Sequence, residues 1–465
     1  MSFVYSLIGL VLTGIPFAFA MALPFILVIW GLWLYRSPIA GVVSVLLLFL
    51  FETLYVQLFS LNLGVHAYPQ DLVFLPLALV AGLRLLKPGA MTRLPGVLWL
   101  LTGMLMLSFS LGLVQNGSRA GVEFRNEFYF LACLFYFSSF VWTSAQIDRL
   151  LNWIMVIALL VLCITWTRWL CDGLGVDWFE RIWALNDETG VPLRVLSSFQ
   201  TFVLGLALLI LVYAMASGKT LTGWLFMVPL LGISILVLQH RSVWVAIFVP
   251  ALMAFVIVRQ NQGRLAGRMA LILAASAVVL VPVLASGKFS SATDSVSEMA
   301  SRATSTTGGT FVGRVNGWQS LLAQWKASGP RAWVLGSPYG SGYAREAGPG
   351  GQEVAYAPHN YYVQLLLRIG LPGLLFFLGF FWWLGRGAVR LAAAPHPGMN
   401  GYVMLGLLFA LLLYYIPYSA SYSHGLLLGV MLAIQLHSAP FVVRAEPKSA
   451  STRRNSLIWT PELHQ

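Results

Sequence analysis

The stretch VPLLGISILVLQHRSVWVAIFVPALMAFVIV (Val228–Val258) decides the fold, because it holds parts of two long apolar runs with almost no loop between them. The runs cover about residues 221–239 and 242–258, and a helix needs about 17–25 residues to cross a bilayer. Only helices and closed barrels satisfy every backbone polar group in lipid, and continuous apolar runs of this length are typical of helices. The stretch therefore predicts two membrane-spanning helices with a tight connection.

Similar runs follow one another along the whole chain of 465 residues. Hydrophobic residues make up 58% and charged residues 9%, whereas soluble domains carry about 25% charged residues. Lipid must therefore be the solvent for most of the chain. We expect an all-α polytopic membrane protein with about 12–14 transmembrane helices. The predicted spans cover about residues 16–35, 40–61, 72–86, 97–115, 128–143, 150–165, 200–217, 221–239, 242–258, 269–286, 360–385, 400–416 and 419–438.

The net charge of +12 could indicate a nucleic-acid partner. The Lys and Arg residues, however, lie between the apolar runs instead of forming one patch, and the positive-inside rule predicts such an excess in cytoplasmic loops. We therefore predict no nucleic-acid binding. Most of these residues occupy the short loops of one side, which is expected to be cytoplasmic. The long loops at about 166–199 and 287–357 are then expected in the periplasm, with the chain in a bacterial inner membrane.

Four regions follow from this pattern. We expect an N-terminal transmembrane bundle at 1–286, a large periplasmic loop at 287–357, C-terminal transmembrane helices at 358–440 and a cytoplasmic tail at 441–465. Five residues of the large loop share one face of a predicted amphipathic helix, which would lie along the membrane surface or cap a cavity. They are Arg314, Trp318, Leu321, Leu322 and Trp325.

Three short segments place polar residues in unusual positions, and two of them contribute arginines. QHRSVW (Gln239–Trp244) puts His240 and Arg241 between two spans. An unpaired guanidinium at this depth is costly, so Arg241 is a functional candidate, and a snorkelling side chain bound to lipid phosphate is the alternative. FVGRVNGW (Phe311–Trp318) places Arg314 at the start of the loop helix.

The third segment, PHNYY (Pro358–Tyr362), puts His359 and Asn360 where the large loop enters a span. Pro358 disfavours helix just before it, and Asn360 or His359 would cap the helix that follows. The free N–H groups and the dipole of a helix N-terminus suit phosphate, and they favour a neutral, proton-accepting imidazole. A lone interfacial histidine is often only a polar contact. Two arginines reachable from the same face favour a functional site.

These residues would give the periplasmic mouth a potential base and at least two fixed cations. Arginine binds phosphate through a planar fork of donors, so two arginines suit a diphosphate leaving group. Acidic residues are few: the first periplasmic loop holds Asp71, and the second holds Glu123 and Glu127, which we interpret as separate. No acidic pair or His/Cys cluster has metal-ligand spacing. We therefore predict a reaction without a metal or other cofactor, in which arginines neutralise the charge.

In these segments the sequence resembles the O-antigen ligase/polymerase superfamily of bacterial inner-membrane glycosyltransferases. The likeness extends over about residues 190–385, while the N-terminal third agrees only in hydropathy. It rests on the motifs RSVW (Arg241–Trp244), GRVNGW (Gly313–Trp318), the His-Asn…Gly-Leu-Pro-Gly stretch (His359–Gly373) and the weaker PLRVLSSF (Pro192–Phe199).

The resemblance implies a GT-C-like enzyme that transfers a glycan from undecaprenyl diphosphate to an acceptor hydroxyl on the periplasmic side. It implies that His359 activates the hydroxyl. By the same resemblance, Arg241 and Arg314 bind the diphosphate and stabilise its departure, with assistance from Arg194.

Three further residues complete the expected substrate-binding set: His240, Asn360 and Arg368. Many members of the family have an acidic residue where this chain has Arg368. That guanidinium could add to the phosphate site or pair with an acid such as Glu127.

The leading hypothesis is an inverting O-antigen ligase, which joins a finished polymer to lipid A–core. A polymerase of O-antigen or exopolysaccharide repeats, with a growing polysaccharide as acceptor, shares the donor and the motifs. A flippase or exporter of lipid-linked glycan is the alternative from another class, and it would not need His359. Membrane lipids are expected partners in each case.

Overall fold

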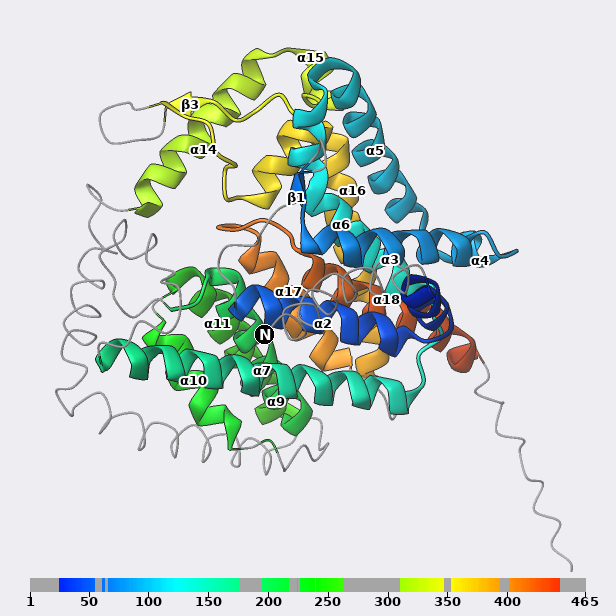
Figure 1. Cartoon of the computed structure of the whole chain (residues 1–465), viewed down its shortest axis with the longest axis vertical. Coiled ribbons are helices and arrows are strands. Elements are labelled where there is room, and N and C mark those ends of the chain that lie inside the picture. The colour runs from blue at the N-terminus through cyan, green and yellow to red at the C-terminus, as the bar shows by residue number, and fades with distance from the viewer. Residues whose placement is uncertain are drawn as a thin grey trace, which may run out of the picture.

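The computed structural model describes residues 25–54, 61–62, 66–174, 195–216, 224, 226–238, 240–261, 310–346, 353–393 and 401–443. In these parts of the chain nearly all secondary structure is helical (Figure 1), which confirms the predicted all-α class of membrane protein. Two short antiparallel sheets are the exceptions there. They pair β1 (Leu61–Asn62) with β2 (His66–Ala67), and β3 (Arg345–Glu346) with β4 (Glu353–Val354).

Most helices follow the predicted apolar runs closely. Helices α5, α9, α11, α16 and α17 each begin within two residues of a predicted boundary. The bounds are α2 Pro38–Leu54, α3 Pro69–Leu85, α4 Ala90–Arg93, α5 Gly96–Asn116, α6 Ser118–Ser138, α7 Ser144–Gly173, α9 Ser198–Ala216, α10 Met227–Val237, α11 Arg241–Asn261, α14 Thr310–Ala327, α15 Pro330–Leu335, α16 Tyr361–Ala393, α17 Gly401–Tyr414 and α18 Tyr422–Val443.

Three helices of the described residues are long and apolar enough to cross a membrane: Gly96–Asn116, Ser144–Cys171 and Tyr361–Ala393. A fourth span arises if the pair Phe25–Arg36 and Pro38–Leu54, bent by 119°, is counted as one. Shorter apolar helices occur in α9, α10, α11 and α17. The number of 12–14 spans stays a prediction, since the expected run at 269–286 and the expected tail beyond 443 lie outside the described residues.

Helix α6 corrects one predicted boundary. It begins at Ser118 instead of near residue 128, so Glu123 and Glu127 lie on a helix and not in a loop. Gly117, whose φ is 59°, allows the tight turn from α5 into α6. The two glutamates are one helical turn apart and face α16, where both find hydrogen-bond donors. Hydropathy alone misses this part of the helix because its polar side chains are paired inside the protein.

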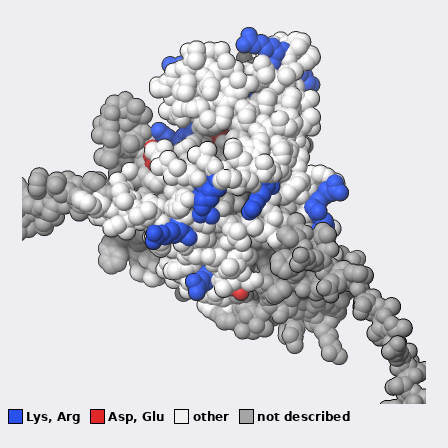
Figure 2. Space-filling model, turned by 90° about the vertical axis from the view of Figure 1, so that its right-hand side faces the viewer, with Lys and Arg blue, Asp and Glu red and all other residues white. Residues whose placement is uncertain are grey.

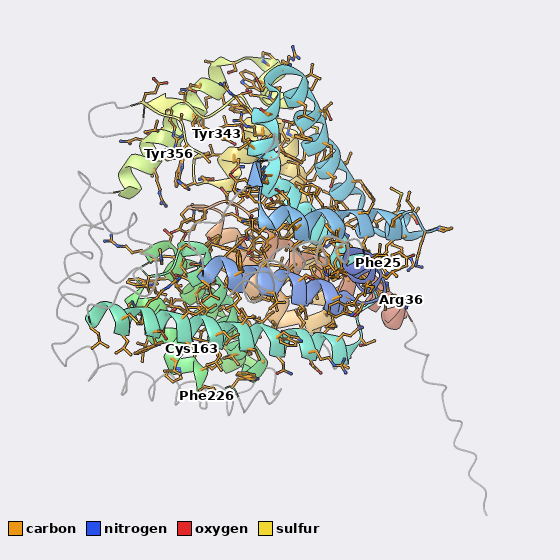
Figure 3. All side chains as sticks on the ribbon, in the orientation of Figure 1. Phe25, Arg36, Cys163, Phe226, Tyr343 and Tyr356 are labelled. Atoms are coloured by element: carbon orange, nitrogen blue, oxygen red, sulfur yellow. The ribbon has the colours of Figure 1, made fainter. Side chains whose placement is uncertain are left out.

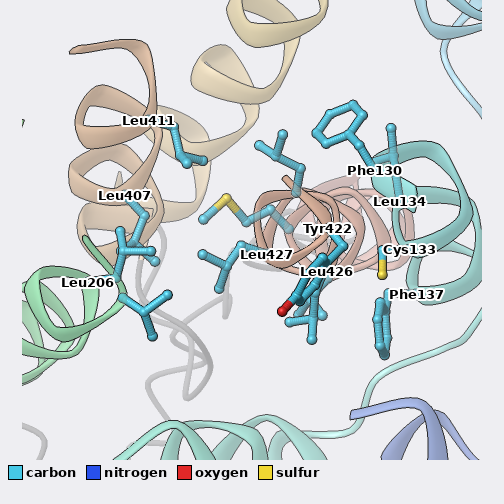
Figure 4. Close-up of a cluster of buried hydrophobic side chains, with 14 of the residues drawn as sticks. Phe130, Cys133, Leu134, Phe137, Leu206, Leu407, Leu411, Tyr422, Leu426 and Leu427 are labelled. Carbon is cyan, nitrogen blue, oxygen red and sulfur yellow. The ribbon is translucent and has the colours of Figure 1, made fainter. Parts of the chain in front are cut away.

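Helix α18 packs along α6 through close contact of the two backbones (Figure 4). A Cβ atom at Gly425 would lie 2.2 Å from the carbonyl oxygen of Phe130, and one at Gly429 would lie 2.7 Å from that of Leu134. Small residues of this kind let helices approach each other inside membranes, where dispersion contacts replace the hydrophobic effect as the attraction. Helix α3 also packs against α6. Helix α6 therefore connects two parts of the bundle.

Helix α16 is broken at Gly370, whose φ of 67° and ψ of −173° are not helical. Pro372 removes the N–H that would bond to the carbonyl of Arg368 in a regular helix. Two neighbouring segments satisfy the carbonyl groups that the break frees: Ser337 N–H donates to Leu367 O (2.7 Å), and the Ser108 hydroxyl donates to Arg368 O (2.7 Å). Such outside donors are what allow a broken helix at membrane depth.

The large loop docks on this break. A Cβ atom at Gly370 would lie 2.4 Å from Val334 O of α15, so only glycine permits the contact. The apolar face predicted for α14 is present as well, and Leu321 on it is buried together with Tyr343 and Leu367. That face packs on α16 and on the loop. Figure 1 shows α14, α15 and β3 grouped beside the ends of α5 and α16.

Candidate functional site

His359 occupies a backbone conformation that few non-glycine residues adopt, with φ at 48°. Such a conformation costs about 1–3 kcal/mol and persists only where the surroundings impose it. Here the surroundings do so on both sides. Trp318 Nε1 of α14 donates to Pro358 O at 2.6 Å, and Asn360 Oδ1 accepts from Val363 N–H at 3.1 Å. The Asn360 bond confirms the predicted N-cap of α16 and ties the histidine to that helix.

The imidazole of His359 lies among an aromatic ring and two cations. Its ring centroid is 5.6 Å from that of Tyr356. Although His359 is exposed, partial desolvation lowers its pKa below 6.5, and the charges of Arg314 and Arg345 lower it further. Arg314 thus lies close enough to His359 for its charge to act on the imidazole. A neutral imidazole beside positive charge can accept a proton at neutral pH.

Arg314 reaches this position from the start of α14. Its Nη1 donates to Pro417 O at 3.4 Å, and its guanidinium carbon lies 5.6 Å from the centroid of the Tyr418 ring. Both partners belong to the connection between α17 and α18. Arg314 therefore contacts the transmembrane part of the chain while its charge acts on His359 of the loop.

Arg345 is a neighbour of His359 that sequence reasoning missed. The side chain is 5% exposed, and its Nη1 donates to Tyr343 O (3.0 Å) and Tyr356 O (2.6 Å). Its guanidinium also stacks on Tyr356, 4.9 Å from the ring centroid. Figure 3 shows Tyr343 and Tyr356 in the part of the loop next to α14. Arg345 lies next to a glycine-rich connector, in a segment without helical or strand periodicity. Its charge and its closeness to His359 along the chain were the only features of the sequence that could have pointed to it.

The second predicted group centres on the start of α11. His240 Nε2 donates to Leu196 O at 2.9 Å, and the His240 carbonyl accepts from Val243 N–H as the helix begins. Arg241 is the first residue of α11 and is partly buried. Arg194 lies outside the described residues. The segment that follows it is nevertheless held next to His240, so the weaker motif and QHRSVW meet in space.

Stacked rings connect helix α9 to Arg314. Phe202, one turn into α9, stacks on Tyr414 at 3.9 Å, and Tyr414 stacks on Tyr418 at 4.7 Å. Tyr418 is the ring under Arg314. Helix α11 also packs on α17, which bears Tyr414. The approach of Arg241 to His359 through these helices stays a prediction.

Arg368 is placed differently from the other predicted site residues. It is 2% exposed and forms an ion pair with Glu123 of α6, and its Nη2 donates to Gly342 O at 2.7 Å. The acid is thus Glu123 and not Glu127, which instead accepts from Gln364. Glu123 also accepts from a backbone N–H of the loop. This geometry favours the ion-pair interpretation of Arg368, in which it fastens the loop to α6 and α16.

Within the described residues, no three His, Cys, Asp or Glu side chains come close enough to hold a metal ion. The arginines and the imidazole are the polar groups that the structure gathers at this site. They could bind an anionic group and accept a proton.

Comparison with known proteins gives one family match. The family model described as O-antigen ligase matches residues 225–378, a segment that contains Arg241, Arg314 and His359. This match bears out the predicted resemblance to the O-antigen ligase/polymerase superfamily. None of the curated proteins compared with the chain matches it.

Proposed function

We propose that this integral membrane protein is a glycosyltransferase with undecaprenyl-diphosphate glycan as its donor, because its residues 225–378 match the family model described as O-antigen ligase. The acceptor is a hydroxyl group on the periplasmic face of the bacterial inner membrane. The observation that carries the proposal is the imidazole of His359, held in a strained backbone conformation beside the charges of Arg314 and Arg345. Removal of a hydroxyl proton and departure of a diphosphate require a base and cations together.

In the proposed reaction, His359 accepts the proton of the acceptor hydroxyl while its oxygen bonds to the anomeric carbon. The bond from that carbon to the diphosphate oxygen breaks, and undecaprenyl diphosphate leaves with the electron pair. Attack and departure occur on opposite faces, so the configuration inverts. Arg314 and Arg241 bind the diphosphate through their paired N–H donors and stabilise its charge. These arginines neutralise the negative charge that a metal ion would neutralise in other enzymes, and the reaction needs no cofactor.

The electrostatics around His359 support its role as the base. Partial desolvation and two arginines lower its pKa, so the imidazole is neutral when the donor site is empty. A bound diphosphate would offset the positive charges, and the pKa of His359 would then rise toward its ordinary value. The donor itself would therefore make His359 a stronger base. Proton transfer would be efficient only in the complex with the donor.

Two activities of the superfamily are compatible with this reaction, and they differ in the acceptor. We assign ligase-type transfer to lipid A–core as the leading function. Polymerisation of O-antigen or exopolysaccharide repeats onto a growing polysaccharide is the alternative, with the same donor and the same base. A flippase or exporter of lipid-linked glycan is the alternative from another class, and it would have no use for a proton acceptor at His359.

The test uses the purified protein with undecaprenyl-diphosphate glycan and each candidate acceptor. We expect His359→Ala to bind donor normally and to lose about 10²–10⁴-fold in turnover, the usual contribution of a general base. Gln319→Ala, at an exposed position of the same loop helix, is the matched control and should keep full turnover. EDTA should change neither protein. Undiminished turnover in His359→Ala would show that His359 is not the general base. Loss of product with EDTA would overturn the metal-free mechanism.

A further inference from the structure

A cavity with a volume of about 240 Å³ lies at the end of α6 that is remote from the large loop. Near the start of α6, Glu123 bonds to Gly340 of the loop, whereas Ser138 and Ser139 at the other end line the cavity. The 21 residues of α6 separate these ends by about 30 Å at 1.5 Å per residue. This cavity is therefore distinct from the site at His359.

Segments that are distant in sequence meet around this space, called the basic cavity below. They come from α3, α4, the end of α6 and the end of α18. None of the described residues that line it is acidic. Its polar lining residues are Arg84, Lys87, Arg93, Ser138, Ser139 and His437.

Arg84 forms a fixed wall of the basic cavity. Its Nε donates to Ser139 Oγ (3.0 Å) and its Nη2 to Ser139 O (3.0 Å), while its Nη1 donates to Tyr35 O (2.9 Å). The carbonyl groups at a helix C-terminus carry partial negative charge. Arg84 compensates that charge at the end of α6, and the lining holds two other cations.

Lys87 and Arg93 are those two cations, and both are exposed. Among the described residues neither forms an ion pair with a carboxylate, since the ion pairs found there involve other arginines. Their backbone is constrained: Gly89 turns the chain with a φ of 77°, and Trp99 Nε1 donates to Met91 O at 3.2 Å. Two cations are thus held at a cavity without an anionic partner.

The rim of the basic cavity is apolar. Leu86 and Met91 are adjacent in sequence to lining residues and are 74% and 47% exposed, and the lining residue Val141 is 60% exposed. The positive-inside rule explains why basic residues occur in such a loop, but it does not explain their convergence on a cavity walled by α6 and α18. A ligand that fits has a compact anionic head for the cations and apolar chains for the rim.

We propose that the basic cavity binds the phosphate headgroup of an anionic phospholipid of the surrounding membrane. Figure 2 shows Lys and Arg side chains gathered across the middle of the face that bears α4, with few carboxylates among them. The headgroup phosphate would accept from Lys87 and Arg93, and the acyl chains would lie along the rim. Such a lipid would fasten α3, α6 and α18 together at this end of the bundle. The proposal does not depend on the function proposed for His359.

The test titrates the purified full-length protein with phosphatidylglycerol or phosphatidylcholine and counts bound lipids by native mass spectrometry. Each basic residue near a membrane surface strengthens anionic lipid binding about fivefold, so Lys87→Gln/Arg93→Gln should weaken phosphatidylglycerol binding about 30-fold. The matched control is Arg386→Gln/Arg390→Gln, which removes two exposed charges from α16 outside the cavity. It should keep the phosphatidylglycerol affinity.

A third variant, Ala90→Trp, keeps every charge and fills the cavity that Ala90 lines. It should also lose the preference for phosphatidylglycerol, and its melting temperature shows whether it is folded. Equal losses in the control would mean that diffuse surface charge binds the lipid, which overturns the proposal. Full competition by millimolar inorganic phosphate, with no gain from acyl chains, would mean a free-phosphate site and would overturn it too.

Discussion

Replacing Gly370 by alanine tests the joint between α16 and the large loop. The φ of 67° and ψ of −173° at this residue are accessible almost only to glycine, so a side chain there costs about 1–3 kcal/mol. The new Cβ atom would lie 2.4 Å from Val334 O, and α15 must move away. That movement breaks the bond from Ser337 N–H to Leu367 O, which leaves buried polar groups unpaired at a cost of about 1–3 kcal/mol. The sum is a destabilisation of about 2–6 kcal/mol.

The assay compares Gly370→Ala with Gly385→Ala, a change in the same helix. No atom lies within 4 Å of a Cβ atom built on Gly385, and alanine favours a helix interior over glycine by about 1 kcal/mol. Chemical unfolding in detergent should therefore show opposite signs for the two variants. Hydrogen exchange should show that only Gly370→Ala exposes the amide of Ser337.

The joint also affects the proposed chemistry, since the displaced segment leads on to Arg345 beside His359. We expect turnover to fall in Gly370→Ala and to be unchanged in Gly385→Ala. Equal stability of the two variants, with equal protection of Ser337, would refute the account of the break given above.

The site, its supports and the expected topology can be tested in four other ways. Arg241→Ala or Arg314→Ala should abolish transfer in a folded protein and Lys should rescue poorly, because it lacks the two-pronged donor; full activity of the Lys variants would contradict this role. The base must be neutral and its pKa is below 6.5, so activity should fall only at acidic pH. Arg345→Gln should raise the pKa of His359 and therefore move this loss of activity to higher pH. Glu123→Ala leaves a buried guanidinium without its carboxylate and should lower the free energy of unfolding by about 3–5 kcal/mol. A reporter fused within the large loop should be active only in the periplasm, and activity in the cytoplasm would reverse the proposed orientation.

The helix boundaries were predictable from hydropathy where the helix is apolar on nearly every side. Helix α5 (Gly96–Asn116) matches the expected run at 97–115 because its sequence is apolar on nearly every side. Helix α6 was not, because its first turns carry charged residues that find partners on α16. Hydropathy measures transfer from water to lipid, so it underestimates a polar helix that is satisfied by protein.

Site residues were predictable where their role depends on the neighbouring sequence. Asn360 has the residue type, the position after Pro358 and the following apolar run of a helix cap, and the structure confirms the cap. Arg345 obeys no such rule, since its position depends on bonds to the carbonyl groups of Tyr343 and Tyr356. The choice of Glu123 over Glu127 as the partner of an arginine likewise depends on how α6 faces α16.

The His-Asn…Gly-Leu-Pro-Gly motif acquires a physical reason from these contacts. Its first half places His359 and caps α16, while its second half breaks the same helix so that the loop can dock on it. Arg314 and Arg345, whose charges act on the histidine, both belong to that loop, so their position depends on where the loop is fastened. A motif that spans 15 residues thus contains both the proposed base and the helix break on which the loop with the two arginines docks. We therefore expect the break in α16 and the proposed base at its N-terminus to act as a single functional unit.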